Sequence, residues 1–159
     1  MSDTEKQFRR VERSFEKVLD THNRDPGEYE DDFWTFVHNC WHLKDWMRGD
    51  VNGLQKKTRA RIDSDVHSFW KLVLIGDLAN RTRYLKLNDR ETEEEVQSRE
   101  LRLVSNEQQE SGEGNGDIVL TVTDNMRLEY PVRELAKDAM RIWHNIFKAY
   151  GLGHLLRKS

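Results

Sequence analysis

Three polar side chains in the run Phe33 to Arg48 are spaced so that they could act together. His38 and His42 lie four residues apart and Asp45 follows three residues later, so a helix would place all three on one side. Two imidazoles at this spacing can bind one metal ion, but a zinc or iron site needs a third and usually a fourth ligand. No motif supplies these further ligands. We therefore expect no cofactor and keep a metal-dependent bundle enzyme only as a third hypothesis.

Cys40 lies between the two histidines and is the only cysteine of the chain. A thiol nucleophile needs a base within hydrogen-bonding reach. Positions two residues apart on a helix point about 200° apart, so Cys40 would face away from both His38 and His42. The sequence therefore predicts a small buried thiol in a reducing compartment rather than a catalytic cysteine.

A second group of polar side chains interrupts the apolar pattern in DLANRTRYLKL, residues 77–87. The group comprises Asp77, Asn80, Arg81, Arg83 and Tyr84. Polar groups on a buried face usually need internal partners, so Asp77 and Asn80 could bond to the neighbouring helix and determine its register. The alternative is a ligand-binding cleft at this helix end. Residues 56–86 carry eight basic and three acidic side chains, which could attract phosphates or pair with the chain's own acidic segment.

Helices are the elements that must position these groups. From Phe33 to Met47, apolar residues recur at steps of three and four, which is typical of a helix with a buried face. Trp34 and Trp41 add a second stripe, so this helix is expected at the centre of a bundle. The stretch HNRDPGE, residues 22–28, predicts a chain reversal before it, and Gly49 predicts its end.

Three further stretches carry helical periodicity. The first follows a capping box formed by Ser2 and Glu5 and runs to about residue 21. The next runs from Ser64 to about Tyr84 and contains Gly76, which costs about 1 kcal/mol of helix propensity relative to alanine. Close approach of the tryptophans would explain that cost. The last stretch runs from about residue 131 to Tyr150.

Residues 88–117 carry ten acidic and three basic side chains and include ESGEGNGD, which predicts a flexible acidic loop. Around it, LRLV at 101–104, IVLTVT at 118–123 and MRLEY at 126–130 predict two or three short antiparallel strands. The expected fold is mainly α. It is a four-helix bundle with a small antiparallel β-insertion, at about 88–131, between the third and fourth helices.

The composition predicts one folded domain over residues 1–159. Hydrophobic residues make up 36% and charged residues 35%, and the apolar residues are clustered periodically, so the chain can bury a core. The N-terminal run MSDTEKQFRR has no apolar signal core, and no apolar run approaches the ~20 residues that span a bilayer. We therefore predict a cytoplasmic protein without a membrane partner.

Two stretches resemble a family of small uncharacterised bacterial and phage proteins. NCWHLKDWMRGD at 39–50 matches its motif Cys, aromatic, His, Leu, Lys, Asp, Trp, and DLANRTRYLKL at 77–87 matches Asp-Leu-x-Asn. The resemblance covers the second and third helices and, more loosely, the fourth. It brings no established chemistry with it. The four-helix layout is also distantly similar to HEPN-type domains, which are common in toxin–antitoxin and phage-defence systems and include many metal-independent ribonucleases.

The HEPN resemblance implies an Arg followed after four to six residues by a His, on a helix that meets its dimer mate. Arg61 and His67 fit this spacing. Such a site needs a base near the RNA 2′-hydroxyl and a cation near the phosphate. Tyr84 stands where relatives in the first family carry His, and Arg83 stands for Lys. The departure at Tyr84 argues against nuclease activity.

Three functions therefore follow from the sequence. The first is a non-catalytic helical-bundle protein that binds an unknown protein or RNA partner, associated with a mobile-element, toxin–antitoxin or phage-defence system. The second is a HEPN-like ribonuclease acting as a homodimer. Its candidate catalytic residues are His42, Asp45, Arg61 and His67. The third is the metal-dependent enzyme.

Overall fold

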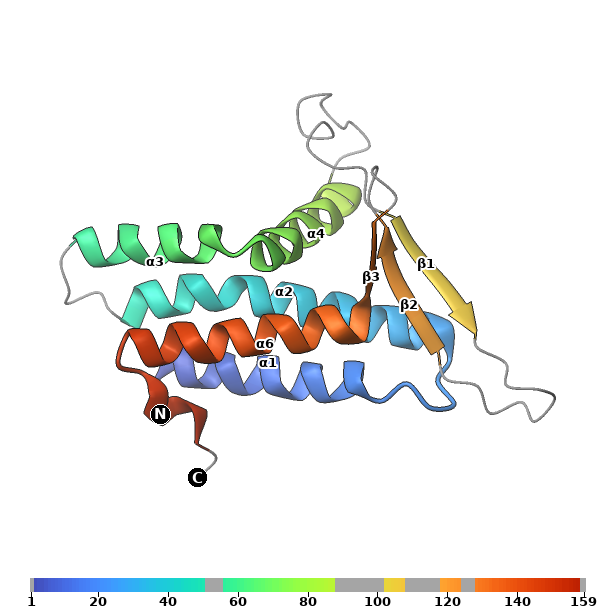
Figure 1. Ribbon diagram of the computed structural model, residues 1–159, viewed down its shortest axis with the longest axis horizontal. Coiled ribbons are helices and arrows are strands. Elements are labelled where there is room, and N and C mark those ends of the chain that lie inside the picture. Colours follow the sequence, from blue (N-terminus) through green and yellow to red (C-terminus); the bar gives the residue numbers. More distant parts are fainter. Residues whose placement is uncertain (1, 51–55, 88–101, 108–117, 124–127, 158–159) are drawn as a thin grey trace.

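The computed structural model describes residues 2–50, 56–87, 102–107, 118–123 and 128–157. It is mainly helical, with a small antiparallel sheet (Figure 1). The helices are α1 (Asp3–Leu19), α2 (Pro26–Asp50), α3 (Lys56–Ser68), α4 (Trp70–Leu87), α6 (Val132–Ala149) and the short 3₁₀ helix η1 (Gly153–Leu156). The strands are β1 (Arg102–Glu107), β2 (Ile118–Thr123) and β3 (Glu129–Pro131).

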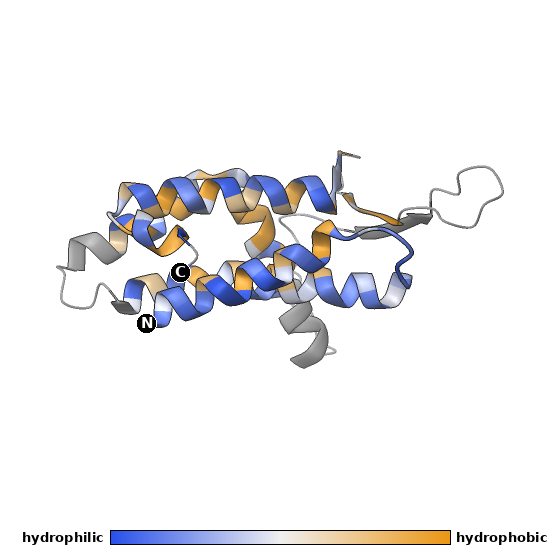
Figure 2. Ribbon diagram, turned by 90° about the horizontal axis from the view of Figure 1, so that it is seen from below, coloured by the Kyte–Doolittle hydropathy of each residue, from blue (hydrophilic) through white to orange (hydrophobic). Residues whose placement is uncertain are grey.

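Figure 1 shows α1, α2 and α6 side by side along the long axis of the molecule, with α3 and α4 along the opposite side of α2 and the sheet at one end. The hydrophilic faces of these helices point outward and the apolar ones inward (Figure 2). No helix within the described ranges is long and apolar enough to cross a membrane.

α1 begins where the sequence predicts. Ser2 is its N-cap, and the Ser2 Oγ accepts a hydrogen bond of 3.1 Å from the Glu5 N–H. The buried face of the helix contains Phe8, Val11 and Val18. The predicted amphipathic first helix is therefore confirmed.

α2 begins earlier than predicted, because Pro26 and Gly27 belong to its first turn rather than to the chain reversal. The Asp25 carboxylate accepts a 3.0 Å hydrogen bond from the Glu28 N–H, as an N-cap residue does. Proline suits the first helical position because the N–H it lacks would have no intrahelical partner there. The reversal lies just before Asp25, where Asn23 adopts a left-handed conformation with φ of 54°. At its other end, α2 continues through Gly49 to Asp50.

The predicted buried stripe of α2 is confirmed. Its six members are fully buried: Phe33, Phe36, Val37, Cys40, Leu43 and Met47. Trp34 and Trp41 are partly buried and pack against this core. α2 is therefore covered over much of its circumference, as expected for a central helix.

The predicted third helix is two helices, α3 and α4, which meet at Phe69. The Ser68 hydroxyl donates to the Asp65 carbonyl at 2.6 Å, a side-chain bond that competes with the helical ladder. The periodicity of the predicted third helix places Phe69 and Trp70 on its buried face, but they are 36% and 50% exposed, so this part of the prediction is wrong. The break allows the chain to bend while Val66 and Leu72 both remain in the core.

The three strands form a sheet of order β1-β2-β3. Both pairs are antiparallel, and Val122 lies opposite Leu103 on one side and Tyr130 on the other. The predicted strand at 118–123 is confirmed at both ends. β3 runs directly into α6 at Pro131. Residues 88–101 and 108–117, which contain most of the predicted acidic loop, lie outside the described residues.

Candidate functional site

The outer face of α2 carries two of the candidate residues, His42 and Asp45, and also Trp46. His42 Nδ1 lies 3.3 Å from Asp45 Oδ2, and both side chains are about half exposed. Trp46 lies four residues beyond His42 and is 39% exposed, whereas most large apolar side chains of the described residues are buried. A large aromatic side chain is therefore partly exposed to solvent beside a His–Asp pair.

A line of ion pairs connects this face to α3. Arg48 Nη1 lies 3.8 Å from Asp45 Oδ1 and 3.4 Å from Asp63 Oδ1. Arg48 is thus shared between a carboxylate of its own helix and one of the next. We call the set His42, Asp45, Trp46, Arg48 and Asp63 the α2–α3 surface. Trp46 and Arg48 lie at its two edges, because positions two residues apart on a helix point about 200° apart.

Trp41 lies on the side of α2 that faces α3 and α4. The Lys44 ammonium lies 3.9 Å from the centroid of its ring, and the His67 ring meets it edge-on at 6.0 Å. His67 Nδ1 is 2.7 Å from the Asp63 carbonyl oxygen. His67 is thereby oriented by its own helix and by Trp41.

The structure does not bring Arg61 and His67 together. Six helical residues turn the chain through about 600°, so the two side chains leave α3 in directions about 120° apart. His67 contacts Trp41, whereas Arg61 is close enough to Tyr150, at the end of α6, for its charge to affect that phenol. The HEPN-like pair is therefore not assembled within one chain.

Tyr150 connects α6 to α3. Its hydroxyl donates to Asp65 Oδ2 at 2.5 Å. Burial and this carboxylate raise the pKa of Tyr150 to about 12, while the positive charge of Arg61 lowers it in part.

The metal hypothesis gains no support from the described part of the chain. The His38 and His42 rings are stacked, with centroids 6.4 Å apart and planes 16° from parallel. No three His, Cys, Asp or Glu residues within the described ranges are grouped so that they could bind a metal ion.

Cys40 is fully buried, as predicted. Burial raises the pKa of its thiol to about 12, and the indole of Trp143 lowers it in part. Trp143 Nε1 makes no conventional hydrogen bond among the described residues, so the sulfur is its polar neighbour. A thiol in this state is protonated at neutral pH and cannot serve as a nucleophile.

The polar group at the end of α4 is only partly described. Asp77 is half-buried and Asn80 is exposed. The side chains of Arg81, Arg83 and Tyr84 lie outside the described part of the structure, so the predicted binding role of these residues stays a prediction. Trp41 of α2 lies directly against Gly76 of α4.

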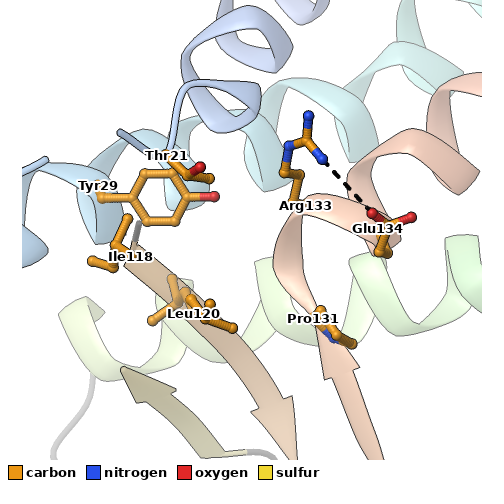
Figure 3. A pocket seen from close by; sticks show the side chains of 8 residues that line it. Thr21, Tyr29, Ile118, Leu120, Pro131, Arg133 and Glu134 are labelled. Carbon is orange, nitrogen blue, oxygen red and sulfur yellow. Dashed lines mark ion pairs between the residues drawn. The ribbon is translucent and has the colours of Figure 1, made fainter. Parts of the chain in front are cut away.

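A cavity of about 220 Å³ lies at the opposite end of α2, and sequence reasoning missed it (Figure 3). Its walls come from three segments far apart in the chain. They include Thr21, Tyr29, Ile118, Leu120, Arg133 and Glu134. No local pattern predicts such a cavity, because each segment supplies only one wall.

Two lining side chains are held by backbone carbonyls at the end of α1. The Tyr29 hydroxyl donates to the Val18 carbonyl at 2.8 Å, and Arg133 Nε donates to the Leu19 carbonyl at 3.3 Å. Burial raises the pKa of Tyr29 to about 12, against the opposing charges of Arg24 and Arg133. Tyr29 is therefore neutral at physiological pH.

Comparison of the chain with family models, with curated proteins and with solved structures finds no match.

Proposed function

We propose that this chain is a non-catalytic helical-bundle protein that binds a protein partner through the α2–α3 surface. The observation that carries the proposal is Trp46, which is 39% exposed beside charges that are already paired. Tryptophan and arginine are enriched among the residues that dominate binding energy at protein interfaces. Polar side chains that are already paired beside such an anchor are typical of an interface rim.

The balance of charge favours a protein over RNA. Arg48 is offset by Asp45 and Asp63, so these three residues of the surface carry no net positive charge. Nucleic-acid surfaces neutralise phosphates and carry an excess of Lys and Arg. A balanced surface is better matched to a protein with its own mixed charges, including a second copy of this chain.

The architecture suits this role. We propose that α1, α2, α4 and α6 form a four-helix bundle. α3 lies outside this bundle and is joined to α2 by the Arg48–Asp63 ion pair. The resemblance to small bacterial and phage proteins supports a cytoplasmic role in a mobile-element, toxin–antitoxin or phage-defence system. The bundle would then act as a rigid platform for the exposed side chains on α2.

Three immobilised proteins test the proposal: wild type, Trp46→Ala and the control Trp70→Ala. Trp70 is also exposed, at 50%, but lies at the start of α4. A partner protein captured from extracts of the cells that produce this chain should bind wild type and Trp70→Ala with the same affinity. Trp46→Ala should raise the dissociation constant of that partner at least tenfold. Sedimentation of the free chain shows whether that partner is a second copy. Equal binding by Trp46→Ala, or loss of binding after RNase treatment, would refute a protein partner at this surface.

The second candidate is the HEPN-like ribonuclease, and the His42–Asp45 pair favours it. A carboxylate at Nδ1 orients an imidazole so that Nε2 can accept a proton from a substrate. In a homodimer, cationic groups of the second copy could complete the site. RNA incubated with the protein in EDTA should then be cleaved, and His42→Ala should abolish cleavage while His67→Ala should not. Intact RNA with the wild-type protein would eliminate this candidate.

A further inference from the structure

The cavity between the end of α1, strand β2 and the start of α6 has mainly apolar side chains on one side and a charged pair on the other (Figure 3). Ile118 and Leu120 are each only 3% exposed, and the ring of Tyr29 forms a further wall. Arg133 and Glu134 lie at the opposite side. A ligand with one apolar and one charged end matches this division of the walls.

The Arg133 guanidinium has donors to spare among the contacts that the structure describes. Its Nε is bonded to the Leu19 carbonyl, which anchors the side chain beside the cavity. Its Nη1 lies 3.9 Å from Glu134 Oε1, which is an ion pair but longer than a hydrogen bond. The Nη edge of the guanidinium therefore remains available for a planar, bidentate acceptor.

The net charge of the residues around Arg133 suits a ligand with a single negative charge. Glu134 is shared with Lys137, whose Nζ lies 3.6 Å from the same oxygen, Oε1. Arg133, Glu134 and Lys137 together carry one net positive charge. A doubly charged phosphate would be repelled by Glu134, whereas a carboxylate carries one charge and fits the planar fork of an arginine.

The size of the cavity limits the ligand. Pockets that enclose drug-sized molecules have volumes of roughly 300 to 1,000 Å³. At about 220 Å³ this cavity is smaller and admits a body of only a few carbon atoms. Its neutral phenol, Tyr29, adds no opposing charge.

We propose that this cavity binds a small monocarboxylic acid with an apolar body of a few carbon atoms, with the carboxylate on Arg133 and the body against Ile118, Leu120 and Pro131. The site is independent of the α2–α3 surface and lies at the other end of α2. A chain that binds a protein partner at one end and a small acid at the other could report the presence of that acid.

Isocaproate and its neutral isostere isocaproamide test the proposal with the full-length wild-type chain. Titration is followed by the backbone amide signals in proton–nitrogen NMR spectra. We expect isocaproate to bind with a dissociation constant on the order of 1 mM, as is usual for a ligand of so few atoms. Its shifts should centre on Thr21, Leu120 and Arg133. Isocaproamide should bind at least tenfold more weakly.

Arg133→Gln should reduce the affinity for isocaproate to the affinity that the wild-type chain has for isocaproamide. Arg141→Gln is the matched control, because Arg141 is an exposed arginine of the same helix that pairs with Asp138 and does not line the cavity. It should bind isocaproate like wild type. Equal binding of acid and amide by the wild-type chain, shifts centred elsewhere, or no shifts at all would overturn the proposal, and these three readings do not depend on how Arg133→Gln folds.

Discussion

Gly76 of α4 lies directly against the indole ring of Trp41 of α2. A Cβ atom built on Gly76 would lie 2.7 Å from three carbon atoms of that ring. Real Cβ atoms essentially never approach another heavy atom so closely. The absence of a side chain at Gly76 therefore determines how near α2 and α4 can come, and this contact explains why a glycine occurs within a helix.

Gly76→Ala should destabilise the protein although alanine is the better helix former. The added methyl group overlaps the Trp41 ring, and overpacking of this kind costs about 1 to 3 kcal/mol. The gain in helix propensity is only about 1 kcal/mol. Urea unfolding measures the difference.

Gly49→Ala is the control for this substitution. Gly49 is also helical, but a Cβ atom added there would meet no described atom within 4 Å. The change should therefore leave the free energy of unfolding the same or raise it. Equal stability of the two variants would show that Trp41 moves aside freely.

Cys40 should make the protein less stable in alkali. Burial raises the pKa of its thiol from 9.0 to about 12, so the unfolded chain loses this proton at lower pH than the folded one. The free energy of unfolding should therefore be unaffected below pH 9 and fall between pH 9 and 12. For one such group, the free energy of unfolding falls by at most about 1.4 kcal/mol per pH unit.

Cys40→Ala separates this effect from that of the tyrosines. The pKa values of Tyr29 and Tyr150 rise from 10.0 to about 12, so their contribution is lost only above pH 10. Between pH 9 and 10 the variant should show a flat profile where wild type declines. A thiol reagent should also fail to modify Cys40 in the folded chain at pH 8. Rapid modification at a rate independent of urea would contradict the burial of the thiol.

Arg9 should anchor the C-terminal segment. Its Nη2 donates to the carbonyls of Leu155 and Arg157, both at 2.8 Å, and Leu155 is buried against the core. Arg9→Ala removes two charge-assisted hydrogen bonds and should increase digestion of this segment by carboxypeptidase severalfold. Arg13→Ala, on the same helix, is the control and should digest like wild type. Identical digestion of all three proteins would show that Leu155 alone retains the segment.

Tyr150→Phe should loosen α3. The lost hydrogen bond to Asp65 is a polar contact between α3 and the end of α6, and its removal should cost about 1 kcal/mol because the pair is only partly buried. Amide hydrogen exchange in residues 60–68 should accelerate more than exchange in α1. Tyr29→Phe serves as the matched control, because it removes a hydrogen bond to the Val18 carbonyl at the other end of α2, and it should leave exchange in α3 unchanged. An equal acceleration in α1 and α3 would mean that the whole domain, rather than α3, is loosened.

The sequence alone determined the parts of this protein that depend on neighbouring residues. The cap at Ser2, the buried stripe of α2, the strand at 118–123 and the burial of Cys40 follow from helical and strand periodicity, which brings apolar side chains to one face. The His42–Asp45 contact is equally local, because residues three apart on a helix are neighbours.

Only the tertiary structure decided what depends on the distance between elements. The Arg48–Asp63 ion pair joins two helices, and the cavity beside Arg133 combines segments around residues 21, 118 and 131. The break at Phe69 also escaped prediction, because apolar residues continue across it at helical spacing and this periodicity is the same for one helix or two. The local spacing of apolar residues specifies which face of an element is buried. Packing of the whole chain determines which other element covers that face.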